Sequence, residues 1–154
     1  MMSPRLKIVI TSLVPVVAFL LDRGTKLIAR KMAVTAGTRL QTGILDTIVH
    51  ENHGIVANVP VPIPVIIAAT LIIVAVLIAV WARAMSRGRL VEVIALGLII
   101  GGACSNLFDR YLFGFVYDWI LIFNRSVVNV ADITIVFGAI LYGVEVGKKR
   151  VVEK

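Results

Sequence analysis

The sequence has few of the residues that most enzymes use for metal binding or thiol chemistry. It contains one cysteine, Cys104, and two histidines, His50 and His53, among 154 residues. A single cysteine excludes an intrachain disulfide and a cysteine-rich metal site. Cys104 lies between glycines and an apolar run, which is typical of a small buried residue. Two histidines without an HExxH pattern are weak evidence for zinc, so we expect no metal and no cofactor.

Charged residues are also scarce. They make up 16% of the chain, whereas 59% of it is hydrophobic. A soluble domain of this length would be about half apolar and about a quarter charged. The sequence therefore predicts an integral membrane protein with one domain, residues 1–154. The formal net charge is +7. Basic loops that face anionic lipid explain this charge better than nucleic acid does, so we expect no nucleic-acid partner.

Four long apolar segments predict an all-α membrane protein built as a four-helix bundle. They cover about residues 8–28, 61–82, 91–108 and 127–146, and about 20 apolar residues cross a hydrocarbon core of about 30 Å. A signal peptide could also begin like the first segment, but no small-x-small cleavage site follows it. Small residues spaced for close helix packing occur in the third and fourth segments, at Gly97, Gly101, Gly102, Gly143 and Gly147.

The long polar stretch at residues 30–58 separates the first two segments. Residues 44–49 are rich in β-branched side chains and predict a short strand, and residues 50–54 predict a polar turn. At the end of the first segment Asp22 and Lys26 are four residues apart. They could form a surface ion pair or anchor a functional site, and their spacing leaves both possibilities open.

Basic residues predict the orientation in the membrane. They occur in the N-terminal tail, at residues 83–89 and in the C-terminal tail, so both termini are expected in the cytoplasm. With this orientation five polar residues lie at or beyond the outer face: Asp22, Asn52, Asp109, Asp118 and Asp132. Because carboxylates near membrane spans are costly, this group predicts a functional site near the extracytoplasmic face.

Residues 106–132 concentrate this chemistry. Two carboxylates that meet in a pocket of low dielectric constant share a proton and can activate a water, as in aspartic proteases. Spacing alone does not say which aspartates pair. We predict Asp118, in the loop before the fourth segment, and Asp132, just inside that segment. Asp109 shares a helix face with Asn106 and Arg110. We expect Asp109 to hold Arg110 or backbone groups and so to position the loop that carries Asp118.

Several segments resemble the lipoprotein signal peptidases (type II signal peptidases) of bacteria: GGACSNLFDR, FGFVYDWI, NVADITIVFG, LLDRGTK and ENHG. The resemblance covers the whole chain. It implies an aspartyl intramembrane protease of the bacterial inner membrane, with Asp118 and Asp132 as its catalytic dyad. It also implies a small β-cradle in the first outer loop. The supporting positions that match the family are Asp22, Lys26, Asn52, Gly54, Asn106, Asp109, Arg110, Asn129 and Ala131.

The resemblance implies that the substrates are prolipoprotein signal peptides, cut just before a diacylglyceryl-modified cysteine. Membrane lipid is the other expected partner, and we expect a monomer. Two positions depart from the family pattern. Ile55 and Val56 follow Gly54, where the family usually has Ala-Phe, and Ser105 stands where glycine is common. The first departure leaves substrate gripping and acyl-chain preference open.

Two other functions are compatible with parts of the sequence. A small proton-coupled membrane carrier could use the same carboxylates, but it predicts inverted repeats and helices broken near the midplane. The sequence shows neither, and its carboxylates group at one face. A structural or assembly subunit is compatible with the glycine spacing, but it gives no reason for the polar residues at one depth.

Overall fold

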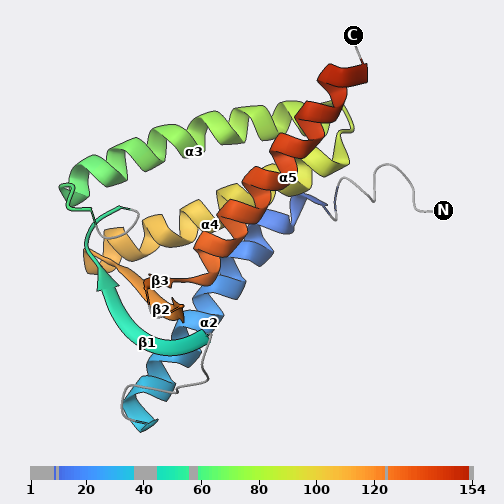
Figure 1. Cartoon of the computed structure of the whole chain (residues 1–154). Coiled ribbons are helices and arrows are strands. Elements are labelled where there is room, and N and C mark those ends of the chain that lie inside the picture. The colour runs from blue at the N-terminus through green and yellow to red at the C-terminus, as the bar shows by residue number, and fades with distance from the viewer. Residues whose placement is uncertain (1–8, 10, 37–44, 56–58, 124, 153–154) are drawn as a thin grey trace.

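The structure is a computed structural model of the chain, and it describes residues 9, 11–36, 45–55, 59–123 and 125–152. Long helices lie beside one another and a small sheet lies against one part of them (Figure 1). The elements in chain order are α2 (Val14–Ala36), β1 (Leu45–Asn52), α3 (Ile63–Ser86), α4 (Leu90–Phe113), β2 (Val116–Ile122), β3 (Ser126–Val128) and α5 (Val130–Val152).

Helix α4 is the centre of the bundle and packs against α2, α3 and α5. Its glycines allow this close approach. A Cβ atom at Gly101 would overlap the carbonyl oxygen of Pro15 in α2, and one at Gly102 would lie 2.6 Å from the carbonyl oxygen of Ala131 in α5. The predicted packing role is therefore confirmed for this part of α4. It is wrong for Gly143 and Gly147, where an added Cβ would meet nothing within 4 Å.

Three helices in the described part of the chain are long and apolar enough to cross a membrane. They are α3, α4 and residues 130–148 of α5, which correspond to three of the four predicted segments. Helix α2, in the region of the first predicted segment, is not among them. It carries Asp22, Arg23, Lys26, Arg30 and Lys31, and these charges lower its mean hydropathy.

The sheet has the order β1-β2-β3, and both pairings are antiparallel. The strand predicted at residues 44–49 is confirmed for residues 45–49, which are part of β1, and residue 44 lies outside the described residues. The turn predicted to start at residue 50 is wrong, because β1 continues to Asn52 and pairs His50 with Asp118. The loop predicted around Asp118 is also wrong, since Asp118 lies in β2. The fourth segment begins later than predicted, because residues 126–128 form β3.

A tight chain reversal brings β2 next to α4. Gly114 caps α4 with φ of 76°, a left-handed conformation that glycine adopts without steric cost, and its N–H donates to the carbonyl oxygen of Arg110 over 3.1 Å. The chain enters β2 two residues later, at Val116. The C-terminal part of α4, strand β2 and the first turn of α5 are thereby brought together.

Candidate active site

Asp118 and Asp132 both accept hydrogen bonds from Asn129, Asp118 from its side-chain amide and Asp132 from its backbone N–H. Asp118 is on β2, and its side chain is buried with 1% exposed. Asp132 is in the first turn of α5. The Asn129 Nδ2 donates to Asp118 Oδ1 over 2.6 Å, and the backbone N–H of Asn129 donates to Asp132 Oδ2 over 3.2 Å. Asn129 therefore fixes both carboxylates.

The sequence explains this local geometry. Asn129 precedes α5, and its Oδ1 accepts the backbone N–H of Asp132 over 2.9 Å. Together with the reciprocal bond from the Asn129 N–H to Asp132, this is the arrangement of a capping box, which satisfies two N–H groups at a helix start. The four residues NVAD thus begin the helix and aim the Asp132 carboxylate at the same time.

Each carboxylate accepts a further hydrogen bond from a distant amide. Asp118 Oδ2 accepts from Asn52 Nδ2 over 3.0 Å, and Asp132 Oδ1 accepts from Asn106 Nδ2 over 2.9 Å. Burial raises the pKa of Asp118 to about 6, and the nearby charge of Asp132 adds to this rise, while the amide hydrogen bonds oppose it. Asp118 can therefore exchange a proton near neutral pH.

A buried ionic cluster lies behind the two carboxylates. Lys26 is 1% exposed, and its Nζ is 2.7 Å from both Asp22 Oδ2 and Asp109 Oδ2. It also donates to Asn106 Oδ1 over 3.1 Å. Asp22 in turn accepts the Ala131 backbone N–H over 2.9 Å. Asp22 and Lys26 thus form a buried pair, so the surface ion pair is wrong, and the pair contacts Asn106 and Ala131 beside the two carboxylates.

Asp109 connects this cluster to the strand that carries Asp118. Its Oδ2 accepts the backbone N–H of Tyr117 over 3.3 Å, so the predicted contact with backbone groups is found. The predicted alternative, an ion pair with Arg110, is not found. Asp109 pairs with Arg23 and Lys26 of α2 instead. Arg110 points elsewhere, because its Nη2 donates to the carbonyl oxygen of Gly54 over 3.1 Å.

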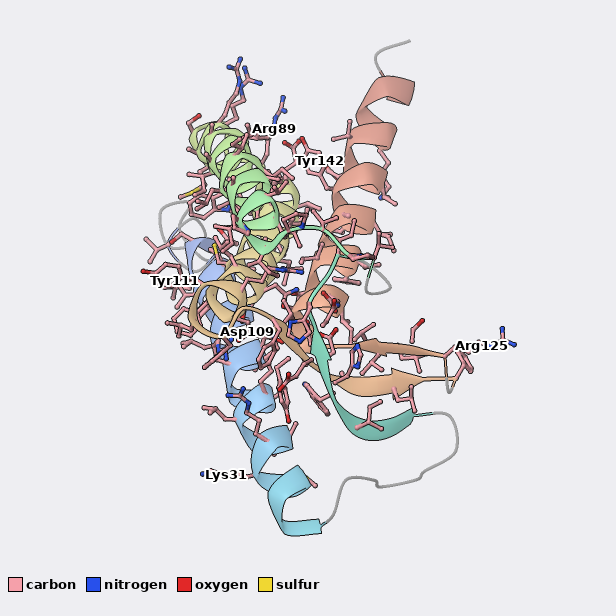
Figure 2. All side chains as sticks on the ribbon, turned by 90° about the vertical axis from the view of Figure 1, so that its left-hand side faces the viewer. Lys31, Arg89, Asp109, Tyr111, Arg125 and Tyr142 are labelled. Carbon is pink, nitrogen blue, oxygen red and sulfur yellow. The ribbon has the colours of Figure 1, made fainter. Side chains whose placement is uncertain are left out.

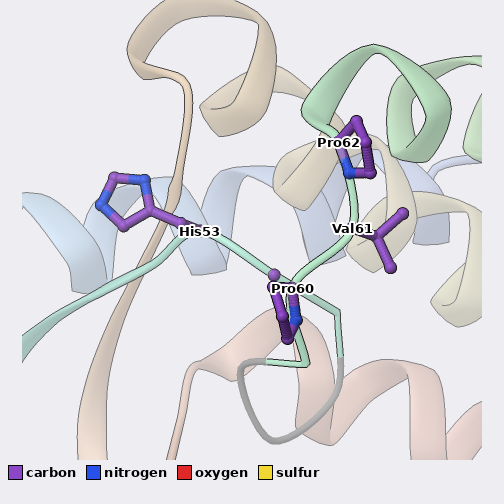
Figure 3. Close-up of a pocket in the computed structure, with 5 residues that line it drawn as sticks. His53, Pro60, Val61 and Pro62 are labelled. Carbon is purple, nitrogen blue, oxygen red and sulfur yellow. The ribbon is translucent and has the colours of Figure 1, made fainter.

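The turn after β1 is attached to the site at two points. Asn52 Oδ1 accepts the Gly54 N–H over 3.0 Å, so Asn52 both forms its own turn and contacts Asp118. Arg110 holds the other side of Gly54. A pocket of about 640 Å³ lies between this turn and the start of α3, lined by His53, Gly54, Pro60, Val61 and Pro62 (Figure 3). Residues 56–58, which include part of the departure from the family pattern, lie outside the described residues.

All eleven predicted site residues belong to one hydrogen-bonded network in the structure. Sequence reasoning missed three contributors. Arg23 lies beside Asp22 in the LLDRGTK segment, and its charge within an apolar helix was an available signal. The Ser105 hydroxyl donates to Asp22 Oδ2 over 2.6 Å, although Ser105 was noted only as a departure. The backbone N–H of Tyr117 leaves no signal in a sequence.

The chain is similar to curated lipoprotein signal peptidases. The lipoprotein signal peptidase of Ectopseudomonas mendocina (strain ymp) is 37% identical over 86 residues, which are 53% of this chain and 51% of that protein. The lipoprotein signal peptidase of Syntrophomonas wolfei is 45% identical over 75 residues, 49% of this chain and 48% of that protein. The chain thus spans about half the length of the curated relatives it matches.

Solved structures show the same fold. A bacterial membrane enzyme determined at 2.3 Å resolution has a TM-score of 0.74 and 22% identity, and the match covers 94% of this chain and 91% of that one. A second, determined at 1.9 Å resolution, has a TM-score of 0.69 and covers 88% and 91%. The family model described as Signal peptidase (SPase) II matches residues 14–147. Because this match extends over most of the chain and includes every residue of the network, the protein belongs to the signal peptidase II family.

Proposed function

We propose that this chain is a membrane-embedded aspartic endopeptidase that removes signal peptides from prolipoproteins. It cleaves on the N-terminal side of a diacylglyceryl-modified cysteine, with Asp118 and Asp132 activating one water. The observation that carries the proposal is the pair of carboxylates that both accept hydrogen bonds from Asn129, at the start of an apolar helix. The similarity to lipoprotein signal peptidases supports the choice of substrate.

The reaction uses one proton shared by the two carboxylates. The ionised carboxylate takes a proton from the water as its oxygen attacks the scissile carbonyl carbon. The protonated carboxyl gives its proton to the carbonyl oxygen, which produces a tetrahedral diol. The C–N bond then breaks: the departing nitrogen takes a proton from the protonated carboxyl, and one hydroxyl of the diol returns its proton to the ionised carboxylate, so the dyad again holds one proton. The products are a signal peptide with a new carboxyl terminus and a lipoprotein with a free amine on its cysteine.

The surrounding amides keep the dyad in place before substrate arrives. The side-chain amides of Asn52, Asn106 and Asn129 each donate to one of the two carboxylates. Polar groups that are fixed in advance stabilise the charges of the transition state without having to reorganise. In this scheme the dyad is catalytic, whereas Lys26 and Asp109 act through the residues that they hold.

The membrane arrangement that we propose has four helices, with both termini in the cytoplasm and the dyad near the extracytoplasmic face. Helix α2 is included because its charged residues Asp22 and Lys26 are buried inside the protein, while Leu20 remains 59% exposed. Ile72 of α3 is 67% exposed and Ile140 of α5 is 61% exposed, as expected for helices surrounded by lipid. We place this monomer in the bacterial inner membrane.

The orientation has a direct test by cysteine labelling. Position 87 follows α3, and position 41 lies in the first loop, outside the described residues. Labels at these two positions should react from opposite sides of the membrane. Reaction of both from the same side would contradict the arrangement.

Cleavage of a lipid-modified precursor tests the function. The acyl chains of the substrate cysteine would remain in the hydrocarbon, where each buried methylene contributes about 0.8 kcal/mol. The reconstituted protein should cut a diacylglyceryl-modified precursor immediately before the cysteine, as determined by mass spectrometry, and should cut the unlipidated precursor far more slowly. Equal cleavage of both precursors would contradict the assignment.

A further inference from the structure

Arg23 is a charged residue of the site region to which the family resemblance assigned no role. It lies on α2 beside Asp22, pairs with Asp109, and its side chain is 16% exposed. Its guanidinium lies 5.0 Å from the centre of the Phe108 ring, which packs edge-on against Phe19. The aromatic contact and the ion pair hold Arg23 from two directions.

Arg23 completes the charge balance of the buried ionic cluster. The cluster contains two carboxylates, Asp22 and Asp109, and Lys26 is within 2.7 Å of both. One lysine neutralises only one of them. Arg23 supplies the second positive charge, because it binds the Asp109 oxygen that Lys26 leaves free. With Arg23 the four side chains sum to zero charge, and without it they sum to one negative charge.

This cluster is directly bonded to the dyad network. Lys26 donates to Asn106 Oδ1, the Asn106 amide donates to Asp132, and the Asn129 amide connects Asn106 to Asp118. A net charge on the cluster therefore acts on the dyad through buried groups, where solvent and salt screen little.

The other charged or titratable groups around the dyad are few among the described residues. Arg110 comes from α4, His50 lies opposite Asp118 on β1, and Tyr117 precedes Asp118 on β2. Glu51 on β1 and Arg30 on α2 act on Tyr117. A substitution at position 23 leaves all of these groups in place, so its electrostatic effect can be separated from theirs.

We propose that Arg23 is a positioning residue for the dyad, because it keeps the buried cluster neutral and thereby sets the pH range in which the dyad cleaves. This inference rests on the proposed function. A negative charge left on the cluster would make the two carboxylates hold their protons more tightly. A unit charge about 10 Å away, at an effective dielectric constant of about 20, changes a pKa by about one unit.

The test is the pH profile of cleavage of the diacylglyceryl-modified precursor. Arg23→Gln leaves the cluster negative and should move both limbs of the profile to higher pH by about 0.5–1 unit. Arg23→Lys keeps the charge and should keep the profile. Asp109→Asn leaves one excess positive charge and should move the limbs to lower pH. The double variant Arg23→Gln/Asp109→Asn is neutral again, and its limbs should return to the wild-type positions.

Arg125→Gln is the matched control, because it also removes one positive charge, but at the exposed tip of the β2–β3 hairpin far from Asp109 (Figure 2). Its profile should not move. A purely structural Arg23 predicts a lower rate or lower stability for Arg23→Gln with unmoved limbs, and that result would overturn the inference. If Arg23→Gln does not fold, the comparison is between Asp109→Asn and the double variant. Identical positions of the pH-profile limbs in these two variants would overturn the inference. Absence of cleavage by the wild-type protein would instead refute the proposed function.

Discussion

Replacing Asp118 by Asn is expected to abolish cleavage and, at the same time, to reduce the loss of stability with rising pH. The side chain is 1% exposed, and burial raises its pKa from the ordinary value of 3.8 to about 6. Because the folded-state pKa lies above the unfolded one, the protonated carboxyl favours folding at low pH. That contribution is lost as the pH rises from about 4 through 6.

The size of the effect follows from the pKa shift. A shift of about two units corresponds to about 3 kcal/mol of stability between the protonated and ionised limits, and most of this stability is lost between pH 4 and pH 8. The Asn amide brings its own cost, because its NH₂ group would face an amide donor from either Asn52 or Asn129. An unsatisfied buried donor costs about 1–3 kcal/mol at any pH. The pH dependence of the difference in stability is therefore more informative than its value at one pH.

The assay is thermal unfolding in detergent micelles at a series of pH values. The difference in unfolding free energy between Asp118→Asn and wild type should change in favour of the variant by about 2–3 kcal/mol from pH 4 to pH 8. Glu51→Gln removes an exposed carboxylate from the neighbouring strand β1 and should follow the wild-type pH dependence. Parallel curves for wild type and Asp118→Asn would refute the claim that Asp118 titrates as a buried carboxyl.

Three further predictions concern packing and the approach of the substrate. Gly101→Val should lower unfolding stability by about 2 kcal/mol or more, because its side chain would overlap α2, whereas Gly143→Ala, which meets nothing within 4 Å, should be neutral or slightly stabilising in the same melts. Arg30→Met should cost about 1–2 kcal/mol in thermal unfolding, because Arg30 lies over the rings of Phe113 at 4.8 Å and Tyr117 at 4.6 Å. Asn52→Ala should lower both the cleavage rate and the unfolding stability, because Asn52 is hydrogen-bonded to Gly54 in its own turn and to Asp118 of the dyad. Normal cleavage by the folded variant would show that Asn52 stabilises only the turn.

Much of the helical bundle could be predicted from the sequence, because long apolar segments have few other stable solutions in a membrane. The segments at 61–82 and 91–108 correspond to α3 and α4. The segment between α4 and α5 was harder to predict. VYDWILI has no clean alternation of apolar and polar residues, because Val116, Tyr117 and Asp118 are all buried. A strand that is covered on both faces cannot be told from a loop or from the start of a helix by periodicity alone.

The eleven site residues were predicted from motifs, but most of their partners could not be. The spacing of Asp109 and Arg110 suggested a pair, whereas the fold places Asp109 against α2 and Arg110 against Gly54. Side chains of adjacent residues on a helix point in different directions, so they contact different elements packed around it. Only the tertiary arrangement determines which partner each side chain meets. The pairing of Asn52 with Asp118 is similar, since it depends on the β1–β2 register.

The most direct test of the central claim is the rate at which the Asp132→Asn variant cleaves a diacylglyceryl-modified precursor, measured beside Asp118→Asn and the double variant. Asp132 and Asp118 are bonded through Asn129 and are proposed to share one proton and one water. If they act as a unit, each single variant should be folded and inactive, and the double variant should be no worse than either. Substantial cleavage by folded Asp132→Asn would contradict the two-aspartate mechanism.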